Sequence, residues 1–117
     1  MVRKIGIDLV NCRKFSDISD KSNLLITKLF TENEINYCFE SSSKSNCFSG
    51  KYAAKEAVIK LLSDQGINIS HIRKIEILNN DEGEPFVNNL QFDNFKGEIL
   101  ISISHDSDFA IAVAILK

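Results

Sequence analysis

The sequence predicts an α+β fold in which a mainly antiparallel sheet packs on one long helix. Two observations carry this prediction. Residues 47–63 place apolar side chains at helical spacing over the longest uninterrupted segment, and residues 109–116 alternate large residues with alanines. The alanine face of that strand would let a helix approach closely, and the alanine stripe of 47–63 is its natural partner. The length of 117 residues fits one domain, 1–117, with one core.

The first predicted element is a strand over residues 2–9. Its apolar residues alternate with polar or small ones, Ile5, Ile7 and Leu9 against Lys4, Gly6 and Asp8. We expect the three apolar side chains to face the core and Asp8 to leave the opposite face. Gly6 leaves room on the Asp8 face for a ligand or another backbone.

Residues 11–29 predict a helix with a break near 19–22. The strongest local signal follows, because Thr31 and Glu34 have the spacing of a capping box. A helix is therefore expected from 31 to about 40.

The long helix 47–63 follows a polar loop at 41–46. Glu56 lies beside a second apolar strip of this helix, so we expect it to be partly enclosed and to have a partner. Lys60, a metal ion, or both could serve as that partner. Lys55 alone is expected on a solvated basic face.

The second half of the chain predicts three strands and a short return strand. Residues 72–78 alternate, 79–85 are dense in turn residues, and Phe86-Val87 would begin the return strand. Residues 98–104 alternate again and lead through a turn into 109–116.

Composition and charge exclude some functions. Hydrophobic residues make up 44% and charged residues 26%, as in a globular protein, and the net charge of −2 argues against general nucleic-acid binding. Residues 1–28 nevertheless hold six Lys or Arg against three Asp. This basic segment could steer an acidic partner, although a solvated face with scattered lysines would give the same count.

The cysteines and the apolar segments indicate in which cellular compartment the protein is expected. Cys12, Cys38 and Cys47 form an odd set with no Cys-x-x-Cys pair, which suits neither a zinc site nor a disulfide framework. We expect reduced thiols in a cytoplasmic protein. No apolar run is long enough to span a bilayer, and the N-terminus does not read as a signal peptide.

Two carboxylates are candidate ligands for a magnesium ion. Asp8 comes at the end of the first strand and Glu56 lies in the long helix. Mg²⁺ prefers oxygen ligands and is commonly held by one or two carboxylates together with substrate phosphates. Two simpler readings remain open: Asp8 could cap the helix that starts near residue 11, and Glu56 could pair with Lys60 one turn on.

His105 follows the strand 98–104 at its C-terminal end, beside Ser104. A structural or simply exposed histidine is the open alternative to a functional one. A catalytic Ser-His pair is disfavoured, because adjacent residues of a strand point to opposite faces and no Gly-x-Ser-x-Gly elbow is present.

In their order and spacing, five motifs resemble those of the holo-acyl-carrier-protein synthases, the short trimeric type of the 4'-phosphopantetheinyl transferase family. The motifs are Gly6-Ile7-Asp8, Phe30-Thr31-Glu32-Asn33-Glu34, Gly50-Lys51-Tyr52-Ala53-Ala54-Lys55-Glu56-Ala57 with Lys60, Asn80-Asp81 with Gly83-Glu84-Pro85, and Ser102-Ile103-Ser104-His105. They span most of the chain, and the central block is the most specific.

The resemblance implies an enzyme that transfers 4'-phosphopantetheine from coenzyme A to a serine of an apo acyl carrier protein. The reaction would depend on Mg²⁺ and release adenosine 3',5'-bisphosphate. The resemblance further implies that Asp8 and Glu56 bind the metal with the coenzyme A pyrophosphate, and that Asp8, Glu56 and Lys60 are catalytic.

The resemblance also assigns binding roles. Lys51, His105 and Lys60 would bind coenzyme A, with Lys60 against the phosphates or the attacked centre. Lys14 would meet the acidic carrier protein. Such enzymes are typically homotrimers with sites between subunits.

The chain departs from the family pattern at three places. The glycine-rich run after the central helix is replaced by 63–68 with a single glycine, Lys51 stands where the family usually has Arg, and Asp106 where it usually has Thr. These departures keep open a coenzyme A-binding protein of the same fold with weakened or lost transferase activity. A structural α+β subunit without a small-molecule site is the third reading.

Overall fold

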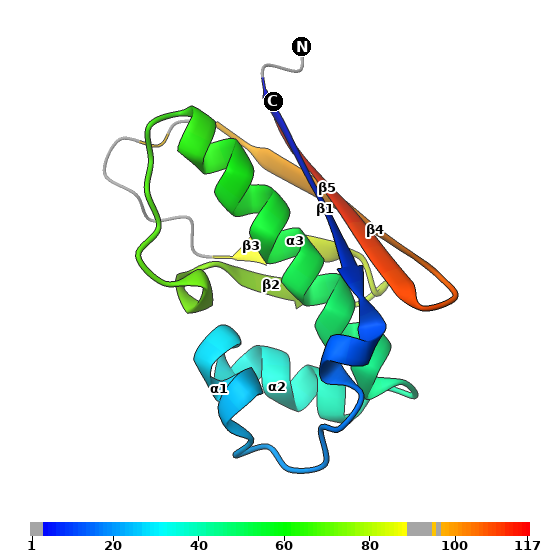
Figure 1. Cartoon of the computed structure of the whole chain (residues 1–117). Helices are drawn as coiled ribbons and strands as arrows, with labels where there is room; N and C mark the ends of the chain where they lie inside the picture. Colours follow the sequence, from blue (N-terminus) through cyan, green and yellow to red (C-terminus); the bar gives the residue numbers. More distant parts are fainter. Residues whose placement is uncertain (1–3, 89–94, 96) are drawn as a thin grey trace.

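The computed structural model describes residues 4–88, 95 and 97–117. The elements are β1 (Lys4–Asn11), η1 (Cys12–Phe15), α1 (Leu24–Leu29), α2 (Glu32–Phe39), α3 (Lys44–Asp64), η2 (Ile72–Lys74), β2 (Glu76–Asn79), β3 (Pro85–Asn88), β4 (Ile99–Asp106) and β5 (Phe109–Leu116). Strands β1-β5-β4 form one antiparallel sheet and β2-β3 a second. Figure 1 shows the long helix α3 lying across the first sheet, with α1 and α2 near its N-terminal end. The predicted α+β fold class is confirmed.

Helix α3 and the first sheet meet through small residues, as predicted. The buried alanines are Ala110, Ala112 and Ala114 on β5 and Ala53, Ala54 and Ala57 on α3. Gly6 on β1 is required by the same contact, because a Cβ atom there would lie 2.0 Å from the Ala57 carbonyl oxygen. The helix backbone therefore rests almost directly on the strand backbone.

The orientation expected for β1 is wrong. Ile5, Ile7 and Leu9 are 59%, 55% and 61% exposed, whereas Gly6 is buried and Asp8 shares its face toward α3. Alternation predicts that a strand has two faces but does not say which face is inward. The outward apolar side chains continue on the neighbouring strands and form a patch that we call the outer sheet face. It consists of Ile5, Ile7, Leu9, Leu100, Phe109 and Ile111.

The helix boundaries differ from expectation where local caps start new helices. Residues 11–29 contain only η1 and α1, because Asn11 and Asn23 each cap a short helix of their own. Helix α3 begins three residues early, at Lys44, since the Ser43 side chain accepts a hydrogen bond from the Asn46 backbone. Part of the expected loop 41–46 is therefore helical.

The capping box of α2 is confirmed. The Thr31 side chain accepts a hydrogen bond from the Glu34 backbone, and the Thr31 backbone donates to Glu34 Oε1 at 2.8 Å. The strand expected at 72–78 begins only at Glu76, after the short helix η2, and returns through a turn in which Gly83 has φ 84°. Strands β4 and β5 lie where the alternation predicts them.

A buried ion pair joins α2 to α3, and the expected solvated position of Lys55 is wrong. The side chains of Lys55 and Glu34 are both 0% exposed, and their charged ends are in contact. Lys55 also donates to the Leu29 carbonyl at 2.7 Å, and Glu34 Oε2 accepts the Ile77 amide at 2.9 Å. Burial lowers the pKa of Lys55, while the Glu34 carboxylate opposes that shift.

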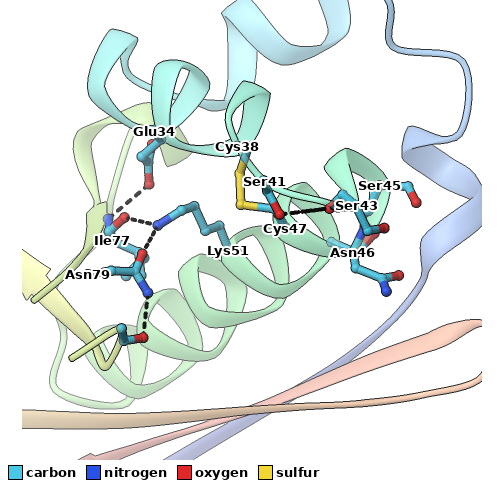
Figure 2. Close-up of a disulfide and its surroundings, with 12 residues drawn as sticks. Glu34, Cys38, Ser41, Ser43, Ser45, Asn46, Cys47, Lys51, Ile77 and Asn79 are labelled. Carbon is cyan, nitrogen blue, oxygen red and sulfur yellow. Dashed lines mark hydrogen bonds between the residues drawn. A yellow bond between two sulfur atoms is a disulfide. The ribbon is translucent and has the colours of Figure 1, made fainter. Parts of the chain in front are cut away.

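The expectation of three reduced thiols is also wrong. Cys38 of α2 and Cys47 of α3 form a disulfide across a sequence separation of 9 residues, and Cys12 is free and buried (Figure 2). The sharp turn between the two helices brings the cysteines together, and their spacing carries no recognised signature of such a pair. Among the described residues, none of the helices has the length and apolar character needed to cross a membrane.

Candidate active site

Asp8 and Glu56 lie in one cavity of about 300 Å³ between β1 and α3, which we call the acidic pocket. Asp8 reaches it from the helix-facing side of β1, and Glu56 reaches it from the middle of α3. The close backbone contact at Gly6 sets this separation of strand and helix. Leu9, Val10, Asn11, Lys14 and Tyr52 complete the lining.

The two simpler readings of these carboxylates do not hold. The helix after β1 is capped by Asn11, whose side chain accepts from the Arg13 amide at 3.0 Å. Lys60 pairs with Asp8, at 3.0 Å between Nζ and Oδ1, and donates to the Ile7 carbonyl at 2.9 Å. Glu56 therefore does not have Lys60 as its hydrogen-bonded partner.

The charges in the acidic pocket favour a bound cation. Burial raises the pKa of Glu56, and the nearby Asp8 carboxylate raises it further, whereas Lys60, Lys14 and Tyr52 lower it in part. Two carboxylates thus share a pocket in which the ammonium of Lys60 is already bonded to one of them. A divalent cation held by Asp8 and Glu56 would offset the negative charge of these two carboxylates.

The donor set fits Mg²⁺ better than a metal that needs a full protein cage. Within the part of the chain that the structure describes, no group of three or more His, Cys, Asp or Glu gathers to hold a metal. Two carboxylates with room for water and substrate phosphates are the usual protein contribution to a magnesium site. Asp8 and Glu56 are the residues that would provide it.

Lys14 lies at the rim of the acidic pocket. Its Nζ atom is 4.5 Å from the centroid of the Tyr52 ring and 3.5 Å from the Tyr52 hydroxyl. The sequence analysis did not assign Tyr52 to the site, although it stands one turn before Glu56. That spacing was the available signal for its place in the pocket.

A second cavity of about 370 Å³, which we call the polar pocket, lies at the other flank of α3. Its walls come from the end of α2, the turn at 41–43, the first turns of α3, the β2–β3 turn and the end of β4. Lys51 and His105 both line it, so the structure brings together these two predicted site residues.

His105 packs against the start of α3. Its Nε2 atom lies 2.8 Å from the Asn46 carbonyl oxygen. Gly50 makes this approach possible, because a Cβ atom there would lie 3.0 Å from the same nitrogen. Asn46 was expected in a loop, so its contact with His105 was not foreseen.

Lys51 reaches from α3 toward the β2–β3 turn (Figure 2). It is only 3% exposed, and its ammonium donates to the Ile77 carbonyl at 2.6 Å and to Asn79 Oδ1 at 2.7 Å. The ring of Tyr37 lies 4.7 Å from the same ammonium. Burial lowers the pKa of Lys51 to about 8, with Glu34 opposing the shift. The structure thus gives the ammonium protein partners in addition to its place in the pocket wall.

The two pockets have no lining residue in common among the described residues. Asp8 and Glu56 gather at the acidic pocket with Lys60 bonded to Asp8, while Lys51 and His105 gather at the polar pocket. Within one chain, the predicted site is therefore divided in two.

Comparison with known proteins gives a consistent family. The model of the 4'-phosphopantetheinyl transferase superfamily matches residues 4–114. The holo-(acyl-carrier-protein) synthase of Halothermothrix orenii is 36% identical to this chain. The alignment covers 98% of this chain and 97% of the relative. The corresponding synthase of Thermodesulfovibrio yellowstonii is 34% identical and covers 99% of each chain.

Solved structures agree with the sequence relatives. The Chronobacterium ammoniagenes ACPS–CoA complex has a TM-score of 0.80 at 25% identity and covers 97% of this chain and 96% of its own. The Bacillus anthracis holo-(acyl-carrier-protein) synthase in complex with CoA (3',5'-ADP) has a TM-score of 0.76 at 30% identity, over 99% and 96% of the two chains. The chain accordingly belongs to the 4'-phosphopantetheinyl transferase superfamily and is an enzyme of the holo-(acyl-carrier-protein) synthase type.

Proposed function

We propose that this chain, acting as one domain over residues 1–117, transfers the 4'-phosphopantetheine group of coenzyme A to a serine of an apo acyl carrier protein. The reaction would require Mg²⁺ and release adenosine 3',5'-bisphosphate. The observation that carries the proposal is the meeting of Asp8 and Glu56 in one cavity of a chain from this family. The names of the relatives and the CoA-bound structures support the choice of both substrates.

The acidic pocket would hold the reacting groups. Asp8 and Glu56 would bind Mg²⁺, which when present neutralises the charge of a pyrophosphate. The Glu56 carboxylate would accept the proton of the serine hydroxyl, directly or through a water molecule. Lys60 holds Asp8 in place and offers its remaining ammonium protons to the phosphates.

The polar pocket would hold the nucleotide end of coenzyme A. His105 and Lys51 supply nitrogen donors at one wall, and the turn at Gly83 and Pro85 supplies another wall. A cavity of about 370 Å³ with few charged groups suits part of a large ligand. Lys14, at the rim of the acidic pocket, would meet the acidic carrier protein.

A homotrimer would reunite the divided site. The outer sheet face leaves several large apolar side chains exposed on three adjacent strands, and exposed patches of this kind commonly mark subunit interfaces. Neighbouring subunits joined through it could set the polar pocket of one against the acidic pocket of the next. This arrangement would explain why the two pockets have no residue in common.

Substitution of the two carboxylates tests the proposal. Asp8→Asn and Glu56→Gln keep the size of each side chain but remove its charge, so transfer to the carrier should fall by about a hundredfold or more. Asp17→Asn and Glu32→Gln are matched controls, because both residues are exposed and line neither pocket.

Thermal unfolding should confirm that the four variants remain folded. Turnover of Glu56→Gln at the level of the original protein would rule out its role as the base. Coenzyme A binding without transfer in the unaltered chain would favour the binding-protein alternative.

A further inference from the structure

The Cys38–Cys47 disulfide lies beside the polar pocket. Cys47 is itself part of the pocket lining, and Cys38 is fully buried on α2. Figure 2 shows the bond between the end of α2 and the first turns of α3, close to the turn that carries Ser41 and Ser43.

The segment enclosed by the disulfide forms much of one wall of the pocket. Ser41, Ser43 and Asn46 all line the cavity and all lie between the two cysteines. The turn is otherwise held by hydrogen bonds: the Ser41 hydroxyl donates to the Ser43 carbonyl and accepts from the Ser43 amide, and the Ser41 and Cys47 amides donate to the Cys38 and Ser43 carbonyls. The disulfide is the one covalent restraint that the described residues show on this wall.

On each side of the disulfide, a nearby residue contacts a side chain that we propose binds coenzyme A. On the α3 side, the carbonyl of Asn46 lies 2.8 Å from His105 Nε2. On the α2 side, Tyr37 stands one turn before Glu40 and places its ring 4.7 Å from the Lys51 ammonium. A change in the packing of α2 on α3 would therefore reach His105 and Lys51 together.

We propose that the Cys38–Cys47 disulfide positions the wall of the polar pocket and makes coenzyme A affinity depend on the redox state of the protein. The inference rests on the proposed function. With the disulfide closed, the wall is ordered before the ligand arrives. With the disulfide open, ordering the segment becomes part of the cost of binding, and affinity falls.

The redox step balances with a dithiol as the reductant. The dithiol delivers two electrons and two protons, the S–S bond breaks, Cys38 and Cys47 become thiols, and the dithiol closes to its own disulfide. In the reducing compartment expected for this chain, disulfides are usually transient and often redox-sensing. Because this disulfide lies in the wall of the polar pocket, breaking it would change how that wall is held.

Cys12 provides an internal control. It is buried, it is free, and it lines neither pocket. Cys12→Ser should therefore leave the redox response intact, whereas Cys47→Ser should abolish it. Cys47 is the better of the paired cysteines to replace, because it is partly exposed and Cys38 is in the core.

The experiment measures the affinity of the full chain for adenosine 3',5'-bisphosphate by equilibrium dialysis, before and after reduction with dithiothreitol. This probe has no thiol, whereas coenzyme A could itself exchange with the disulfide. Intact mass and thiol counting establish the redox state independently of binding. We expect the oxidised protein to bind several-fold more tightly than the reduced protein, and Cys47→Ser to bind like the reduced protein with or without dithiothreitol.

Steady-state kinetics separates positioning from a general loss of structure. Reduction should raise KM for coenzyme A and leave KM for the carrier and kcat nearly unchanged. Equal affinities of the two redox states would overturn the inference while leaving the proposed function intact. Three free thiols after treatment with glutathione disulfide would overturn it as well. No binding of the bisphosphate or of coenzyme A in either state would overturn the proposed function and the inference with it.

Discussion

Lys51 links two elements of the fold and also lies in the wall of the polar pocket. Its ammonium is bonded to Ile77 and Asn79 across the gap between α3 and β2, yet it also lines the polar pocket. An arginine at this position would offer a planar fork of donors, where lysine offers a point charge. Burial lowers the pKa of Lys51 to about 8, so this point charge is lost at a lower pH than in an exposed lysine.

The lowered pKa predicts a pH dependence of coenzyme A binding. Below about 8 Lys51 carries its proton and would attract the phosphates of the proposed ligand, and above that value it becomes neutral. KM for coenzyme A should therefore rise as the pH passes from neutral to well above 8. Lys51→Arg stays charged over this range, so its KM should stay flat in the same measurement. The same rise in Lys51→Arg would assign the effect to another group.

Among the elements, α2 and α3 are joined by more than apolar packing. Glu34 caps its own helix, accepts the Ile77 amide of β2, and pairs with Lys55 of α3. A charge left alone in such a place is costly, because neither water nor another group can compensate for it. Three elements thus depend on one carboxylate.

Removing that carboxylate charge should destabilise the protein strongly. Glu34→Gln leaves the Lys55 ammonium buried without its counter-charge, and we expect a loss of about 3–5 kcal/mol in the free energy of unfolding. Glu34→Gln/Lys55→Met should recover part of this loss, because the unpaired charge is then gone. Glu32→Gln, two residues away on the same helix and exposed, should change stability by no more than about 0.5 kcal/mol. Urea unfolding measures all four, and a loss below about 1 kcal/mol in Glu34→Gln would contradict this account.

These elements show how far the sequence could predict the fold. The capping box at Thr31 and the alanine face of β5 depend on local chemistry, and both were predicted. For Gly6 the sequence predicted only room for a ligand or another backbone, and the structure fills that room with the backbone of α3. The burial of Lys55 could not be read from its own helix, because its partner comes from a different one. The disulfide has the same origin, since only the turn between α2 and α3 brings Cys38 and Cys47 together.

The candidate site likewise has residues that could be predicted from the sequence and residues that depend on contacts with other elements. Asp8 and Glu56 were predicted to share a site, and the structure places both in the acidic pocket. Tyr52 and Asn46 were missed as pocket residues, because their roles depend on Lys14 and His105 approaching from other elements. The faces of β1 were reversed, since alternation is the same whether the apolar side meets a helix or another subunit.

At the scale of the whole molecule, the reversed face of β1 becomes an argument for assembly. The outer sheet face exposes Ile5, Ile7 and Leu9 by more than half each, at successive positions on one face of β1. A subunit interface gives these side chains a place to be buried. The division of the site between two pockets points to the same conclusion.

Disrupting the outer sheet face should therefore separate the subunits. Ile7→Lys places a charge between Ile5 and Leu9 on this face, and we expect the proposed trimer to become a monomer with loss of transfer activity. Leu24→Lys is the matched control, because Leu24 is 73% exposed on α1 and lies outside that face. Sedimentation velocity distinguishes the two states. A monomeric unaltered chain with full activity would contradict a site shared between subunits.

The central claim is the transfer itself, and intact-mass measurement of the carrier tests it most directly. Purified apo acyl carrier protein is incubated with coenzyme A and this chain, with Mg²⁺ in one sample and with a chelator in the other. The account predicts that the carrier gains the mass of one phosphopantetheine only in the sample with Mg²⁺. No gain with any of several carrier proteins, while the chain remains folded, would contradict it.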